Sequence, residues 1–159
     1  MRLLEDLEPR IEPRSSPGHK LRYWLPPILW LAAIFFFSTD SFSGENTGNL
    51  LRKLLLLFGE GWSPEQFGRV HYLIRKAGHF TEYGILAWLL FRAFRSSSDL
   101  RWHWRWLIYS LLIIVTYALL DEYHQSFTRT RGSSVYDSFI DMSGGLAVLL
   151  VIWLKRRRG

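Results

Sequence analysis

Four ionisable side chains recur at helical spacing where a polar stretch of the chain runs into an apolar one. They are Lys76, His79, Glu82 and Tyr83, and the apolar residues 84–91 follow directly. A helix rises 1.5 Å per residue, so Glu82 lies about 9 Å further along the axis than Lys76. A lone carboxylate at bilayer depth costs about 2.5 to 3.5 kcal/mol. We therefore expect Glu82 to be surrounded by polar partners from other helices.

Polar residues of the same kind gather at two later boundaries between polar and apolar sequence. They are Asp121, Glu122, His124 and Gln125 at the end of one apolar run, and Arg131, Asp137 and Asp141 at the start of the next. Residues four apart on a helix share a face, which holds for Asp121 with Gln125 and for Asp137 with Asp141. In an antiparallel bundle these ends lie on the same side of the membrane as Lys76, which predicts a single polar cluster.

The residue types of this cluster support two kinds of chemistry. In an enzyme, Glu82 or Asp121 would serve as the general acid or base and His79 would polarise the substrate. In a binding site, Lys76 and Arg131 would contact a phosphate. The other polar side chains would complete that site, namely Glu122, Gln125, Asp137 and Asp141. The structural alternative is that these charges only pair with one another to close one end of the bundle.

The same cluster contains enough oxygen and nitrogen ligands for zinc or magnesium. These ligands are His79, Glu82, Asp121, Glu122, His124 and Asp137. The spacing of His79 and Glu82 resembles the Glu-x-x-His pattern of di-iron bundles only in reversed order and without a second copy. The favoured interpretation therefore assigns the chain no metal and no cofactor.

Long apolar runs must form the elements that position these residues. Of the 159 residues, 48% are apolar and 16% aromatic, and the net charge is +6. The pattern predicts an all-α membrane protein with four transmembrane helices, at residues 22–38, 76–94, about 102–122 and 137–154. Residues 49–58 are too short to cross and predict a short interfacial helix in the first extracytoplasmic loop. Gly144 and Gly145 allow close helix contact in the last span.

A single membrane domain, residues 22–154, accounts for most of the chain. Residues 1–21 contain Pro9, Pro13 and Pro17 and predict a disordered cytoplasmic tail, and residues 155–159 form a basic cytoplasmic tail. Lys and Arg are more numerous on the side of the two termini, so the positive-inside rule places both termini in the cytoplasm. The same rule explains the basic clusters without a nucleic-acid partner. The absence of cysteine excludes disulfides and thiolate metal sites.

Three motifs carry a resemblance to a known family. They are Lys76-x-x-His79-x-x-Glu82-Tyr83-x-x-Leu86, then Asp121-Glu122-x-x-Gln125-x-Phe127-x-x-x-Arg131, and then Asp137, six residues on. Together with Ser38 at the end of the first run, this pattern resembles the VanZ-like family of small bacterial membrane proteins. That family is named for a protein associated with resistance to the glycopeptide antibiotic teicoplanin. The resemblance implies the fold and a bacterial plasma-membrane location, and it implies almost nothing about mechanism.

The chain departs from the family pattern at Asp141, where the family usually has Asn. The extra carboxylate favours metal binding, or a carboxyl group kept protonated by its neighbours. The expected function is that of an envelope protein whose outward polar pocket binds an anionic lipid or a lipid-linked cell-wall precursor, with an effect on teicoplanin susceptibility. The alternative is a membrane-embedded hydrolase or transferase that uses acid/base or metal-assisted chemistry on an outer-leaflet substrate.

Overall fold

The computed structural model describes residues 16–57, 61–96, 103–127 and 135–157, and helices dominate these ranges. The elements are α1 (Pro17–Phe37), the 3-10 helix η2 (Asp40–Phe42), α2 (Gly44–Leu56), α3 (Pro64–Ser96), α4 (Arg105–Gln125) and α5 (Val135–Arg157). No strand occurs within the four described ranges. The predicted all-α fold class is therefore confirmed there.

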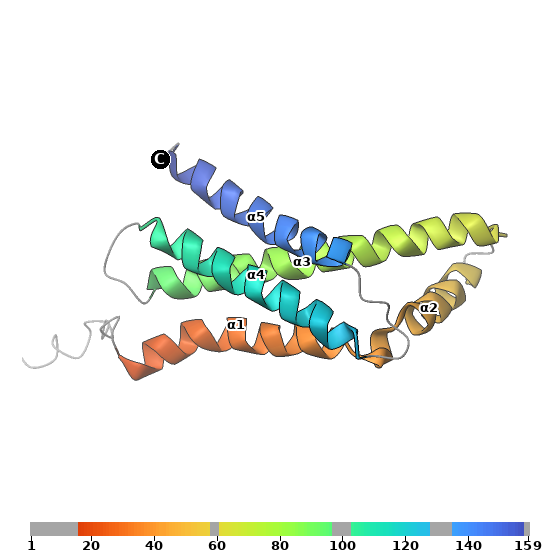
Figure 1. The fold of residues 1–159 in the computed structure, drawn as a ribbon, viewed down its shortest axis with the longest axis horizontal. Coiled ribbons are helices and arrows are strands. Elements are labelled where there is room, and N and C mark those ends of the chain that lie inside the picture. The colour runs from red at the N-terminus through yellow and green to blue at the C-terminus, as the bar shows by residue number, and fades with distance from the viewer. Residues whose placement is uncertain (1–15, 58–60, 97–102, 128–134, 158–159) are drawn as a thin grey trace, which may run out of the picture.

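Helix α3 is the centre of the fold. The helices α1, α4 and α5 pack along its C-terminal part, whereas α2 lies beside its N-terminal part (Figure 1). Tyr83, Leu86 and Leu90 of α3 meet Ile34 of α1 and Ile114 of α4 in the hydrophobic core. The C-terminal part of α3, from His79 to Ala93, therefore lies inside the bundle, whereas its N-terminal part is largely exposed.

Capping residues start two helices earlier than the apolar runs predict. The Ser16 hydroxyl accepts a first-turn N–H of α1 at 3.2 Å, and Pro17 occupies the first turn. At α3, Ser63 Oγ accepts the Gln66 N–H at 3.2 Å and the Gln66 side chain accepts the Ser63 N–H at 3.0 Å, which is a reciprocal capping box. As a result, α1 begins at Pro17 instead of residue 22, and α3 begins at Pro64 instead of residue 76.

The helix predicted in the first connection is present but shifted. Helix α2 covers Gly44–Leu56 instead of residues 49–58. The Ser43 hydroxyl accepts the Asn46 N–H at 3.3 Å and so starts the helix earlier. The helix pair formed by α1 and residues 40–56 is bent by 70°. Helix α2 therefore folds back toward the N-terminal part of α3 (Figure 1).

Within the described ranges, two helices are long and apolar enough to cross a membrane: α4, and residues 136–156 of α5. A third crossing results if the bent pair of α1 and residues 40–56 is one span. Large apolar side chains of α4 and α5 are exposed, among them Leu112, Leu119, Leu146 and Leu150. Soluble proteins rarely expose contiguous apolar surface on this scale, so these helices have the surface expected for contact with lipid.

Helix α5 crosses α3 closely at Gly144. A Cβ atom at this position would collide with the carbonyl oxygen of Phe80. A Cβ atom at Gly145 would lie 2.9 Å from Ile114 Cδ1 of α4. The close contact predicted from the two glycines is confirmed, and it brings the polar side chains of α3 and α5 within reach of one another.

We expect Gly144→Ala to lower the melting temperature of the protein purified in detergent. The added methyl group meets backbone atoms that cannot rotate away, and overpacking of this kind costs about 1 to 3 kcal/mol. Gly68→Ala is the matched control, because Gly68 is an exposed residue of α3 with open space around its Cβ position. Alanine there should be neutral or stabilise the helix by up to about 1 kcal/mol. Equal melting temperatures for both variants would contradict the close crossing.

Candidate functional site

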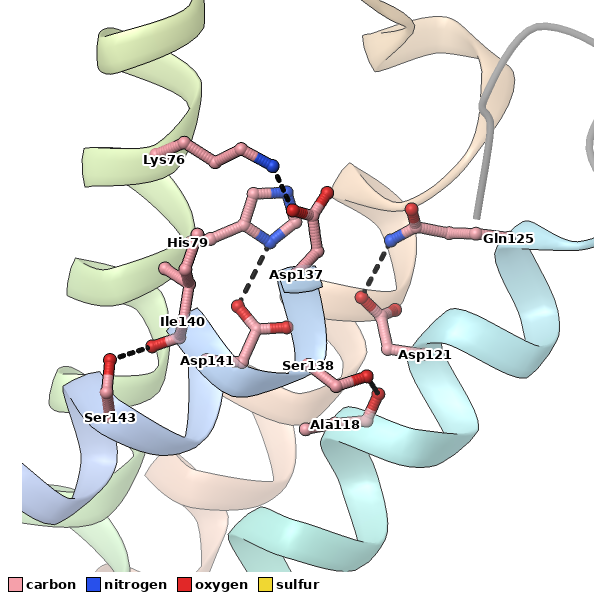
Figure 2. Close-up of polar contacts among 10 residues, drawn as sticks. All are labelled: Lys76, His79, Ala118, Asp121, Gln125, Asp137, Ser138, Ile140, Asp141 and Ser143. Carbon is pink, nitrogen blue, oxygen red and sulfur yellow. Dashed lines mark hydrogen bonds and ion pairs between the residues drawn. The ribbon is translucent and has the colours of Figure 1, made fainter. Parts of the chain in front are cut away.

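An ion pair joins α3 to α5 at one end of the bundle. The Lys76 ammonium lies against the Asp137 carboxylate (Figure 2), and the two side chains are only 20% and 9% exposed. Each charge offsets part of the cost of removing the other from water. The sequence assigned Lys76 to a phosphate ligand, whereas in the structure its charge is matched by Asp137.

A second polar contact lies one turn further along both helices. His79 Nδ1 is 3.1 Å from Asp141 Oδ1, and Asp141 is fully buried (Figure 2). Lys76 and His79 are three residues apart on α3, and Asp137 and Asp141 are four apart on α5, so each pair of neighbours shares a helix face. The two contacts therefore form successive rungs between the helices.

Helix α4 contributes two polar side chains beside the contact of His79 with Asp141. Gln125 Nε2 donates to Asp121 Oδ2 at 2.9 Å, and both residues are buried. Asp121 Oδ1 and Asp141 Oδ2 are also buried, and neither has a hydrogen-bond partner in the described part of the chain. A carboxylate oxygen of Asp121 lies within 4.8 Å of one from Asp141. We call the six residues Lys76, His79, Asp121, Gln125, Asp137 and Asp141 the buried cluster.

Two further residues of this region were missed by the sequence analysis as site residues. Tyr83 is completely buried and interacts electrostatically with Asp121 and Asp141, yet its hydroxyl has no hydrogen-bond partner within the described ranges. The buried Ser138 has its hydroxyl 3.4 Å from the backbone oxygen of Ala118. The sequence analysis singled out Tyr83 by its helical spacing but assigned it no role in the site. No comparable signal marks Ser138.

The remaining predicted residues lie outside the buried cluster. Glu122 is buried on α4, and the half-buried Glu82 lines a cavity beside the cluster. His124 stacks on Phe35, with 4.3 Å between ring centroids. Arg131 lies outside the described residues. The structure thus brings most of the predicted site residues together, and their chemical roles stay predictions.

A cavity of about 310 Å³ lies between the end of α1, α2 and α3. Its lining is partly apolar, with Phe37, Phe42, Leu51 and Ile74, and partly polar, with Ser38, Thr47, His71, Arg75, His79 and Glu82. His79 belongs both to this lining and to the buried cluster. The sequence analysis missed His71 and Arg75 because it started the span at residue 76, whereas the continuous helix α3 places both on the cavity.

Arg75 provides the cationic side of this cavity, and the His71 side chain lies on the same wall. Thr47 Oγ1 is 3.0 Å from His71 Nε2. Burial and the positive charge of Arg75 lower the pKa of His71, so its imidazole is neutral at pH 7. The Arg75 guanidinium lies over Gly44, where a Cβ atom would be 2.5 Å from Nη1, and it has no ion-pair partner among the described residues. Arg75 therefore presents an unmatched positive charge to the cavity.

A protein-family model described as VanZ/LLP1 matches residues 23–156 of the chain. The chain belongs to the VanZ/LLP1 family. This membership confirms the resemblance predicted from the three motifs, and together with the apolar helices α4 and α5 it indicates a membrane protein. No curated protein and no solved structure matches the chain.

The geometry of this VanZ/LLP1 chain supports more than one kind of chemistry. His79 is oriented by Asp141 and lies on the cavity wall, which suits a general base. Arg75 can donate charge-assisted hydrogen bonds to an anion. One ligand atom from each of His79, Asp121 and Asp141 lies within 4.8 Å of the others, so among the described residues these three could hold a metal ion.

We expect Asp137→Asn to destabilise the protein, because it leaves the Lys76 ammonium without its counter-charge. Removing one partner of a buried ion pair costs about 3 to 5 kcal/mol, and the partial exposure of Lys76 places the loss near the lower value. The double variant Lys76→Gln/Asp137→Asn should recover most of the loss, since two neutral amides can hydrogen-bond. Melting temperatures of all four proteins measure this coupling. Additive losses would argue against the pair.

Proposed function

We propose that this VanZ/LLP1 protein is a non-enzymatic component of the bacterial cell envelope that binds the anionic headgroup of a lipid or of a lipid-linked cell-wall precursor. The proposed binding site is the cavity between α1, α2 and α3. The observation that carries the proposal is Arg75, whose unmatched charge lies on a cavity that also has large apolar side chains. A small soluble anion has no apolar group that could contact these side chains, whereas a lipid has one.

The lining of the cavity suits the two parts of an amphiphile. A guanidinium binds phosphate through two parallel hydrogen bonds, which gives both affinity and orientation. Phe37, Phe42 and Leu51 would contact the first carbons of the hydrocarbon chain. At about 310 Å³ the cavity has room for a headgroup but not for a whole lipid. The hydrocarbon chains would extend into the bilayer over the exposed apolar side chains of the bundle.

The proposed membrane arrangement has four spans, formed by α1, α3, α4 and α5. Helix α3 is the least apolar of these, yet α1, α4 and α5 pack around it, so its charges do not face lipid. The distribution of Lys and Arg supports cytoplasmic termini in a plasma membrane. The cavity and the buried cluster then lie on the extracytoplasmic side, where lipid-linked wall precursors are used. An altered supply of such lipids would change how a lipophilic glycopeptide such as teicoplanin accumulates at the surface.

A second candidate function is favoured by the position of His79. Its imidazole is held by Asp141 on the wall of the same cavity, next to Glu82. In a hydrolase or transferase, His79 and Glu82 would transfer a proton to or from a bound outer-leaflet substrate. Glu82→Gln separates the two candidates, because an enzyme would lose turnover and keep binding, whereas a binding protein would be little affected.

We expect Arg75→Gln to weaken binding of anionic lipid by about tenfold, the loss of a charge-assisted hydrogen bond of about 1.5 kcal/mol. Native mass spectrometry of the protein in nanodiscs of mixed phosphatidylglycerol and phosphatidylcholine measures the retained lipid. Arg69→Gln is the matched control, since it removes the same charge from a highly exposed position of α3. If both variants lost the same amount of bound lipid, the loss would come from surface charge in general, and the proposed site at Arg75 would be wrong.

In cells, we expect the wild-type protein to raise teicoplanin resistance and not vancomycin resistance in a sensitive Gram-positive host. Arg75→Gln should abolish this difference at matched membrane expression, whereas Arg69→Gln should leave it intact. Because the headgroup site is the proposed cause, unchanged protection by Arg75→Gln would refute it. No protection by the wild type would refute the link to teicoplanin and leave the lipid measurement to decide the binding function.

A further inference from the structure

The buried cluster holds more negative charge than its own cations neutralise. Asp137 and Asp141 are four residues apart on one face of α5, and a carboxylate oxygen of Asp121 lies within 4.8 Å of one from Asp141, so three carboxylates share this region. Lys76 neutralises Asp137. Asp121 and Asp141 then share His79, which can carry at most one positive charge. A net negative charge at 4% and 0% exposure is costly in a bundle that faces lipid.

One oxygen atom of each of two carboxylates lacks a hydrogen-bond partner among the described residues. Asp121 Oδ1 and Asp141 Oδ2 are buried without a hydrogen-bond partner within the described residues. The hydroxyl of Tyr83 is in the same condition, on a side chain that is 0% exposed and interacts with both aspartates. A buried polar atom without a hydrogen-bond partner loses its interaction with water and gains nothing in exchange. The two aspartate oxygens and the Tyr83 hydroxyl are therefore buried polar atoms that are free to bind a ligand.

The arrangement of the three acceptor side chains matches a small metal ion. One ligand atom from each of His79, Asp121 and Asp141 lies within 4.8 Å of the other two. Zinc binds His nitrogen and Asp oxygen at about 2.0 to 2.2 Å, which places the ligand atoms of a tetrahedral site about 3.4 Å apart. His79 and Asp141 are already at 3.1 Å. Small side-chain rotations would bring the three ligand atoms to bonding distance.

We propose that His79, Asp121 and Asp141 bind a divalent transition-metal ion, with zinc as the best match. A dication with a neutral imidazole balances the two aspartates, just as Lys76 balances Asp137. An imidazole ligand favours zinc over magnesium or calcium, which prefer oxygen ligands alone. Three protein ligands leave a fourth position open, as in catalytic zinc sites. The hydroxyl of Tyr83 is the nearby group that could hydrogen-bond a water in that position.

Gln125 is a positioning residue of this site. Its amide donates to Asp121 Oδ2, which leaves Oδ1 as the oxygen for the metal. Ligating carboxylates are commonly held by such hydrogen bonds, and their loss weakens metal affinity by about 10- to 100-fold. The metal site does not include Arg75, so the metal proposal can be correct even if the lipid proposal is wrong, and the reverse also applies.

The test is a zinc titration of the full-length protein in nanodiscs, purified without a polyhistidine tag and stripped with EDTA. We expect one zinc ion per chain by elemental analysis and a melting temperature that rises with zinc concentration. Asp121→Asn and His79→Gln should each weaken zinc binding more than tenfold. Glu65→Gln is the control, because it removes a highly exposed carboxylate of α3 that lies fourteen residues before His79, and it should keep the wild-type zinc affinity.

Several results would overturn the proposal. Absence of zinc binding by the wild type would show that the two aspartates are neutralised by protons instead. Unchanged binding in both ligand variants would place the zinc on surface histidines, and equal stabilisation by magnesium would refute the transition-metal assignment. If the ligand variants fail to fold, cobalt substitution in the wild type decides: intense visible absorption bands of four-coordinate cobalt support the site, and the weak bands of six-coordinate cobalt refute it.

Discussion

A charged side chain inside a membrane-spanning bundle must find its counter-charge within the bundle, and the contacts between α3 and α5 satisfy this requirement. Lys76 with Asp137 and His79 with Asp141 are successive rungs that fix the register of the two helices. They can form only because Gly144 lets α5 approach the backbone of α3. A slip of one turn would leave one carboxylate and one basic side chain buried without a partner, so charge pairing and close packing specify the same arrangement.

The position of α3 follows from that arrangement. A helix with Lys76, His79 and Glu82 would be unstable against lipid, but α1, α4 and α5 surround it and present their own apolar side chains outward. Side chains of the outer helices also bind backbone oxygens: Trp30 Nε1 donates to Glu82 at 2.9 Å, and Tyr117 donates to Leu31 at 2.6 Å. Such bonds hold the bundle together where lipid supplies no hydrophobic driving force between helices.

The sequence predicted the fold class, the family and the meeting of three helix ends, because hydropathy, helical spacing and motif order are local properties. It did not predict the partners within the cluster. Helical spacing showed that Asp121 shares a face with Gln125, and Asp137 with Asp141. The distance between α3 and α5, however, depends on the contact of Gly144 with Phe80, which is a tertiary contact. The cavity was missed for a related reason. The sequence analysis began the second span at residue 76, whereas the capping box at Ser63 starts one continuous helix at Pro64.

The continuity of α3 has a mechanical consequence. Its 33 residues make a rod about 50 Å long, whereas the hydrocarbon core is about 30 Å thick, so in the proposed arrangement a substantial part protrudes. The protruding end bears on α2 through His71 and Thr47, and the embedded part carries the rungs to α5. A rigid rod transmits torque along its length. A ligand that pushes α2 away from α3 would therefore twist Lys76 and His79 against their partners, which makes α3 a lever between the membrane surface and the buried charges.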